Sequence, residues 1–154
     1  MLAVALAAVL LASAVQARDA TRSILTDVCL PYVTGESDDT AALEFLGFVA
    51  APPSGEGRMY ATEDQAYLLR LTTTGSVADE TLNRVCVIQS RRGELGRVRG
   101  AVTPILRQQG FAAEADAPAD RPIWTKDGVT VSLRQNPGAA VVVRVTYSSL
   151  DAGL

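Results

Sequence analysis

The sequence contains no histidine, and that absence excludes several classes of active site at once. Imidazole is the usual general base beside a serine or cysteine nucleophile, the commonest zinc ligand, and the one side chain that titrates near neutral pH without perturbation. A Ser-His or Cys-His nucleophile and a His-ligated zinc are therefore excluded. The single lysine, Lys126, has no serine three residues before it, so the Ser-x-x-Lys motif is absent too.

Other motifs that carry chemistry are also missing. The chain has no G-x-S-x-G, no Walker loop, no Rossmann fingerprint and no Cys-x-x-Cys. The acidic runs 36–39 and 63–64 lack the ligand spacing and the central glycine of a calcium loop, and we interpret them as a helix cap and a hairpin turn. We therefore expect no catalytic residue, no metal site and no cofactor. The alternative is a small hydrolase that uses carboxylates and arginine.

Basic charge and aromatic side chains are both scarce. The chain has 14 Lys+Arg against 17 Asp+Glu, a net charge of −3, whereas a nucleic-acid-binding domain would be basic. One Trp, four Tyr and three Phe leave few side chains for the walls of a sugar-binding cleft. At 154 residues and 48% hydrophobic content, the chain is long enough for one globular domain.

The first seventeen residues carry no charged side chain. Their apolar run, 2–15, is shorter than the roughly 20 residues that span a bilayer, and Val15-Gln16-Ala17 is a small-residue cleavage pattern. We predict a cleaved signal peptide over 1–17 and a single mature domain over 18–154, periplasmic or secreted, with no membrane insertion after cleavage. A buried N-terminal helix is the alternative.

Cysteine is nearly absent as well. Cys29 and Cys86 are the only two, and they lie 57 positions apart. Because an even number of cysteines in an exported chain favours a disulfide, we predict a bond between them.

The mature chain begins with a predicted helix. Apolar residues recur at helical spacing from residue 20 to residue 33, and Gly35 is a natural end for that helix. The residues that set this spacing are Ile24, Leu25, Val28, Cys29 and Tyr32.

Two later stretches, 37–90 and 94–149, share an order of features. Each begins with a predicted helix, over 40–46 or from about residue 94 with a bend at Pro104. Gly-Phe ends both helices, at Gly47 and at Gly110.

Each Gly-Phe is followed by a loop, 50–57 or 112–122, and then by a short strand that carries Tyr60 or Trp124. An acidic turn and two alternating strands complete each unit. The sequence thus predicts an α+β two-layer sandwich: an antiparallel sheet of about six strands, covered on one face by helices. It would comprise two helix-plus-three-strand units behind one extra helix, consistent with duplication. A chance likeness between two helix-to-hairpin passages is the alternative.

The second unit predicts a partner surface on the solvent face of its sheet. Alternation along its strands places valines and leucines on one face and polar residues on the other. Arginines there could donate to an anion or to a carboxylate-rich partner, or could simply keep the face soluble. The candidate residues are Arg134, Arg144, Thr130, Ser132 and Thr146.

A second candidate site is an arginine-rich stretch opposed only by Glu94. It could bind an anion, or it could reflect a composition of thirteen Arg to one Lys. Its members are Arg84, Arg91, Arg92, Arg97 and Arg99.

These observations favour a non-catalytic binding, inhibitory or accessory module outside the cytoplasm. The expected partner is an envelope protein or an anionic ligand, not a nucleic acid.

Overall fold

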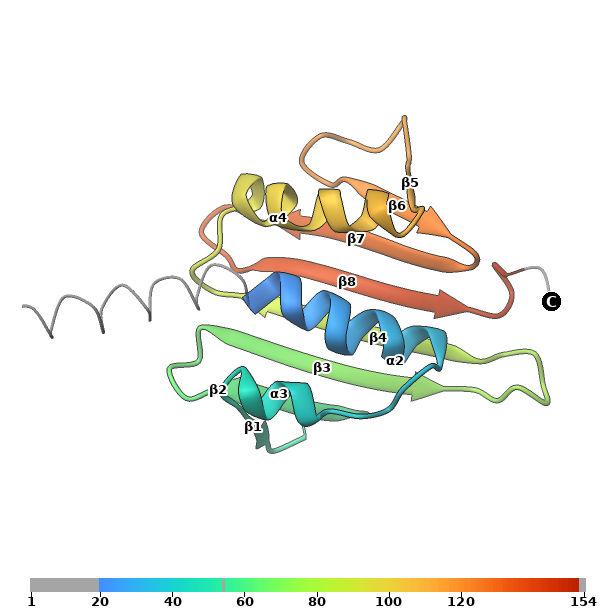
Figure 1. The fold of residues 1–154 in the computed structure, drawn as a ribbon, viewed down its shortest axis with the longest axis horizontal. Coiled ribbons are helices and arrows are strands. Elements are labelled where there is room, and N and C mark those ends of the chain that lie inside the picture. The colour runs from blue at the N-terminus through green and yellow to red at the C-terminus, as the bar shows by residue number, and fades with distance from the viewer. Residues whose placement is uncertain (1–19, 54, 153–154) are drawn as a thin grey trace, which may run out of the picture.

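The computed structural model describes residues 20–53 and 55–152. The predicted signal peptide, 1–17, lies outside the described residues. The chain forms an α+β structure around one antiparallel sheet of eight strands (Figure 1). Its strands are β1 (Phe48–Ala51), β2 (Arg58–Thr62), β3 (Tyr67–Thr74), β4 (Asn83–Ser90), β5 (Ala112–Ala113), β6 (Ile123–Lys126), β7 (Val129–Gln135) and β8 (Val141–Ser148).

The strand order is symmetric about the centre of the sheet. It runs β1-β2-β3-β4-β8-β7-β6-β5, so two four-stranded meanders meet where β4 pairs with β8. The pairing within the meanders also corresponds. In the first, Ala50, Tyr60, Leu69 and Ile88 lie side by side across the sheet; in the second, Ala113, Trp124, Val131 and Val145 do.

The expected number of six strands is wrong, because each meander contains one more strand than predicted. The segment after each Gly-Phe pairs with the following strand as β1 or β5, where we expected only the loops 50–57 and 112–122. Alanine makes up half of β1 and all of β5, and it has low strand propensity. Hydrogen-bonded pairing of β1 with β2 and of β5 with β6 stabilises these strands, although their own sequence does not favour strand formation.

The first helix spans residues 20–34 and is called the central helix here. It includes a π-helical stretch, η1 (Ile24–Cys29), and ends in α2 (Leu30–Thr34). Pro31 lies two residues after the end of η1, has no N–H, and would press its ring on the carbonyl of Asp27 in a regular α-helix. The wider π turn lies where this clash would otherwise occur. Gly35 ends the helix in the left-handed conformation, as predicted.

Two further helices precede the two meanders, α3 (Ala41–Phe45) and α4 (Leu95–Gln108). The N-cap position of α3 is Thr40, whose side chain makes no capping bond, but the carboxylate of Asp39 accepts a hydrogen bond from the N–H of Ala41 at 2.8 Å. Of the acidic run 36–39, only Asp39 thus bonds to a free N–H of the first turn. Figure 1 shows the central helix, α3 and α4 on the same face of the sheet, with the central helix over β4 and β8.

The prediction that Gly47 and Gly110 end their helices in a left-handed conformation is confirmed, with φ of 77° and 85°. Phe48 and Phe111, which follow them, are both buried against the core. Each Gly-Phe pair therefore turns the chain from a helix into the sheet and anchors it there.

Replacing either glycine with alanine should lower the free energy of unfolding by about 1 kcal/mol. An added Cβ at Gly47 would meet no atom within 4 Å, so the cost is backbone strain alone. Gly100→Ala is the matched control: it lies inside α4, also in open space, and should stabilise by roughly 0.5–1 kcal/mol. Urea titrations of the three variants test this, and a gain in stability from Gly47→Ala would contradict it.

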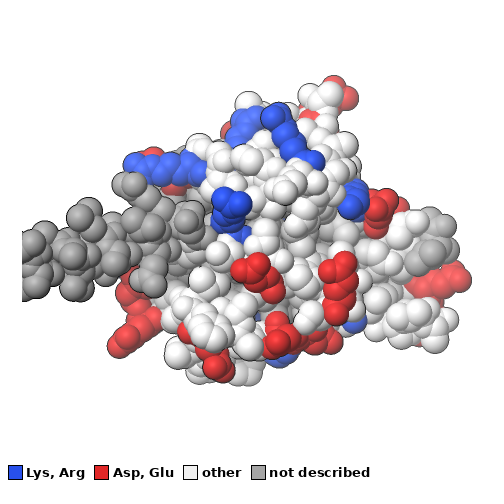
Figure 2. All heavy atoms as spheres, in the orientation of Figure 1, with Lys and Arg blue, Asp and Glu red and all other residues white. Residues whose placement is uncertain are grey.

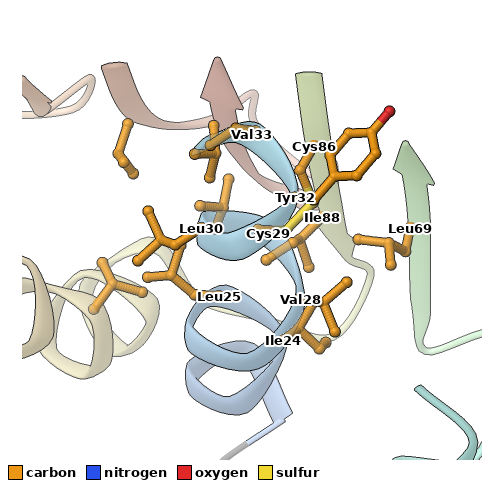
Figure 3. Packing of buried hydrophobic residues seen from close by; sticks show 14 of the residues in the cluster. Ile24, Leu25, Val28, Cys29, Leu30, Tyr32, Val33, Leu69, Cys86 and Ile88 are labelled. Atoms are coloured by element: carbon orange, nitrogen blue, oxygen red, sulfur yellow. A yellow bond between two sulfur atoms is a disulfide. The ribbon is translucent and has the colours of Figure 1, made fainter. Parts of the chain in front are cut away.

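The core lies between the central helix and the middle of the sheet. Figure 3 shows Ile24, Val28 and Leu25 of the central helix among strand residues such as Leu69 and Ile88. The predicted disulfide between Cys29 and Cys86 is confirmed; it joins the central helix to β4 with a Cα–Cα distance of 5.4 Å. Within 20–53 and 55–152, no helix is long and apolar enough to cross a membrane.

Candidate binding surfaces

The central helix contacts β4 and β8 and α4 contacts β7 on one face of the sheet, and the strand side chains that point to the other face form what we call the open face. Strand positions alternate, so the residues between buried ones such as Leu69, Cys86 and Val143 belong to it. Its members are Val49, Ala51, Met59, Ala61, Leu68, Arg70, Thr72, Thr74, Asn83, Val85, Val87, Gln89, Ala112, Ile123, Thr125, Thr130, Ser132, Arg134, Val142, Arg144, Thr146 and Ser148.

The open face holds three arginines and no acidic residue. Arg70 and Arg144 each pair with Val87 from opposite sides, so their Cα atoms lie about 10 Å apart across the sheet. Arg134 pairs with Val142, two positions along β8 from Arg144, and is its diagonal neighbour. All three side chains are exposed, and none makes an ion pair or a hydrogen bond to another described residue.

The predicted partner residues all lie on this face. Arg134 and Arg144 are exposed, whereas the hydroxyl-bearing Thr130, Ser132 and Thr146 are half-buried beside them. The Oγ1 of Thr146 donates to the carbonyl of Thr130 at 3.4 Å. Whether the surface binds a partner stays a prediction.

The open face also lacks aromatic side chains. Stacking on rings is the usual way to hold sugars and unpaired bases, so this face offers them little. Three unopposed guanidinium groups among valines, leucine and threonines suit carboxylates instead.

The predicted arginine-rich patch is divided by the fold. Arg84 is the second residue of β4 and Arg91 follows its last residue, and an eight-residue strand spans about 23 Å. Arg84 Nη1 donates to the carbonyl of Tyr32 at 2.9 Å and lies 3.8 Å from the carboxylate of Asp38. Its guanidinium and that of Arg58 both approach the ring of Tyr32, at 5.8 and 5.7 Å. Arg84 therefore ties β4 to the end of the central helix.

The other four arginines of the patch each have a partner of their own. Two make exposed ion pairs, Arg92 with Asp64 at 3.1 Å and Arg97 with Glu94 at 3.4 Å. Arg91 donates to the Gln65 side chain and Arg99 to the carbonyl of Ala119. The five arginines thus do not converge on one anion, although Arg92 and Arg97 do line the same cavity.

Charge is unevenly distributed over the face that carries the helices. Figure 2 shows Lys and Arg gathered around α4, and Asp and Glu around α3 and the central helix. Helix α4 contains three arginines and no acidic residue.

Two cavities lie at corresponding places in the two halves. The larger, of about 660 Å³, is lined by the end of α3, the turn between β2 and β3, Ser90 of β4 and the start of the central helix. The smaller, of about 370 Å³, is lined by the residues after α4, the turn between β6 and β7, Tyr147 of β8 and the far end of the central helix. The central helix thus contributes one end to each cavity.

Within the part of the chain that the structure describes, no cluster of three or more His, Cys, Asp or Glu could hold a metal ion. Trp124, which could have stacked on a ligand, is buried in the core at 2% exposure.

Comparison with protein-family models, curated proteins and solved structures gave no match.

Sequence reasoning missed Arg70 of the open face and the larger cavity. Arg70 lies in the first unit, and only the pairing of β3 with β4 brings it beside Arg144. The alternation of Leu69, Arg70 and Leu71 could have placed its side chain on the solvent face. No pattern within one stretch of the sequence could have predicted the cavity, because five separate segments line it.

Proposed function

We propose that this chain is a non-catalytic binding module of the periplasm or extracellular space, and that its open face binds a carboxylate-rich partner. The supporting observation is the presence of Arg70, Arg134 and Arg144 on one face without an acidic residue, in a chain of net charge −3. Most other described arginines, such as Arg84 and Arg92, have partners, whereas the side chains of Arg22 and Arg107 do not. The disulfide favours an oxidising compartment.

The test compares Arg134→Gln/Arg144→Gln with the wild type, using hexaglutamate as a defined probe and NMR shift mapping as the readout. We expect shifts on the open face that weaken with added salt and disappear in the double variant, with thermal stability unchanged. Arg22→Gln/Arg107→Gln is the matched control, because both residues are also without a partner among the described residues and neither lies on the open face. Binding that survives in the first variant, or that both variants lose equally, would contradict the proposal.

Capture of partners from the envelope fraction with the same pair of variants extends the test. A partner retained by the wild type and by Arg22→Gln/Arg107→Gln, but lost with Arg134→Gln/Arg144→Gln, would connect the open face to a macromolecule.

We further propose that the two halves arose by duplication, and that they form a two-layer sandwich with the helices as cover. The matched registers support this proposal. Tyr60 and Trp124, which the sequence pattern equates, occupy the same place in the two meanders. The corresponding loops of the two units, 50–57 and 112–122, then lie at opposite edges of the sheet. The open face between them is shared by both halves.

One observation favours a second candidate, the small hydrolase. Asp64 and Glu94 line the larger cavity together with Arg92 and Arg97. The N–H of Ala66 and then the hydroxyl of Thr62 hold the pKa of Asp64 below its usual value, whereas a general acid at neutral pH needs a raised pKa. Both carboxylates are also more than half exposed and paired with arginine, so binding ranks first. Hydrolysis of a nitrophenyl ester or glycoside that Asp64→Asn abolishes would reverse that order.

A further inference from the structure

Two side chains in the wall of the larger cavity carry hydroxyl groups without a hydrogen-bond partner among the described residues. Thr21 and Ser90 line its wall, and each is only 5% exposed. Neither hydroxyl makes a hydrogen bond to any residue that the structure describes. Neither oxygen is among the fully buried polar atoms that lack a partner, so the small exposed part of each residue includes its hydroxyl oxygen. These two hydroxyls are therefore hydrogen-bonding groups that a molecule bound in the cavity could reach.

The smaller cavity, built from the corresponding elements, lacks this feature. Its threonines, Thr26 and Thr34, donate their hydroxyls to helix carbonyls at 3.2 and 3.0 Å. Lys126 likewise donates to the carbonyl of Gln109 at 2.8 Å. The unpaired hydroxyls are thus particular to the larger cavity and do not follow from the repeated architecture.

Apolar side chains form much of the rest of the wall. Val98 and Leu46 lie at the cavity, and Phe45 stands beside them with 91% of its surface exposed. An exposed phenylalanine next to a hollow is apolar area that a ligand could remove from water. A volume of about 660 Å³ is within the range of small-molecule sites.

The mouth of the cavity carries two cations in weak ion pairs. The side chains of Arg92 and Arg97 are 74% and 80% exposed, and exposed pairs contribute little stability, so either guanidinium can turn to a ligand. Asp64 keeps two other donors if Arg92 leaves it: the N–H of Ala66 at 3.0 Å and the hydroxyl of Thr62 at 2.8 Å. The positive end of the α4 dipole lies at the same mouth, where Arg97 and Val98 line the cavity.

We infer that the larger cavity binds an amphipathic carboxylate, a molecule with one anionic head and an apolar chain. The chain lies along Phe45 and Val98, and the head receives hydrogen bonds from Arg92 and Arg97. The unpaired hydroxyls of Thr21 and Ser90 contact the polar atoms next to the head. This site is separate from the open face.

The experiment is a calorimetric titration of the full chain with dodecanoate below its micellar concentration. We expect saturable one-to-one binding, and no binding of dodecyltrimethylammonium, which has the same chain and the opposite charge. Arg97→Gln should weaken dodecanoate binding about tenfold, the effect of losing one charge-assisted hydrogen bond. Arg107→Gln, on the same helix but outside the cavity, should leave it unchanged.

Two further variants separate a ligand role from a structural one. Ser90→Ala removes a hydroxyl that has no partner among the described residues, so it should leave the thermal midpoint unchanged or raise it while weakening dodecanoate binding severalfold. Ala101→Trp, on the cavity wall, should prevent binding by filling the space. The inference is overturned if wild-type binding does not saturate, if the cationic amphiphile binds equally well, or if Arg97→Gln or Ala101→Trp binds dodecanoate like the wild type. Because the NMR shifts show whether hexaglutamate binds at the open face, and the Arg97 and Ala101 variants report on the cavity, either site can fail independently of the other.

Discussion

Replacing Cys86 with alanine should lower the free energy of unfolding by about 2–5 kcal/mol. The bond closes a loop of 57 positions, so its loss returns much conformational entropy to the unfolded chain. Both cysteines are fully buried, and the bond joins the central helix to the β4 strand at the middle of the sheet. The loss should therefore also weaken the docking of that helix.

Urea titrations of Cys86→Ala and of Cys29→Ala/Cys86→Ala measure this loss, and the double variant shows whether the remaining thiol adds to it. Mass spectrometry of the wild type, alkylated without reduction, is the companion measurement. We expect no alkylated cysteine, and two alkylated thiols would contradict an oxidised native protein.

Replacing Trp124 with alanine should cost about 3–5 kcal/mol, because an indole ring at 2% exposure would leave a cavity that the rigid sheet cannot close. Its neighbours across the sheet, Ala113 and Val131, are too small to fill that space. Circular dichroism during urea unfolding is the appropriate readout, since the variant has no other tryptophan to report by fluorescence.

Tyr60→Ala is the matched control, because Tyr60 occupies the corresponding position in the first meander but is only half-buried. It should cost clearly less than Trp124→Ala, since less apolar surface returns to water. Equal losses would show that burial at this position does not set stability.

Several features followed from local sequence alone. The glycines at 47 and 110 ended their helices as expected because no other residue tolerates a left-handed backbone at so little cost. Asp127-Gly128 joined β6 to β7 in a two-residue turn for the same reason. The disulfide also followed, since composition left each cysteine a single possible partner within the chain.

Strand number could not be deduced in the same way. β1 and β5 are short and rich in alanine, and they exist because neighbouring strands offer them backbone hydrogen bonds. A two-residue strand such as β5 has no periodicity to detect.

The sequence by itself determined the α+β class, the helix ends, the disulfide and the solvent face of the second meander, because each depends on residue type or on spacing within one segment. The tertiary structure decided which distant residues meet. It brought Arg70 beside Arg144, separated Arg84 from Arg92, and enclosed Thr21 and Ser90 in one cavity. Such contacts depend on the order in which strands pair, and that order is set by the burial of the whole core rather than by any local pattern.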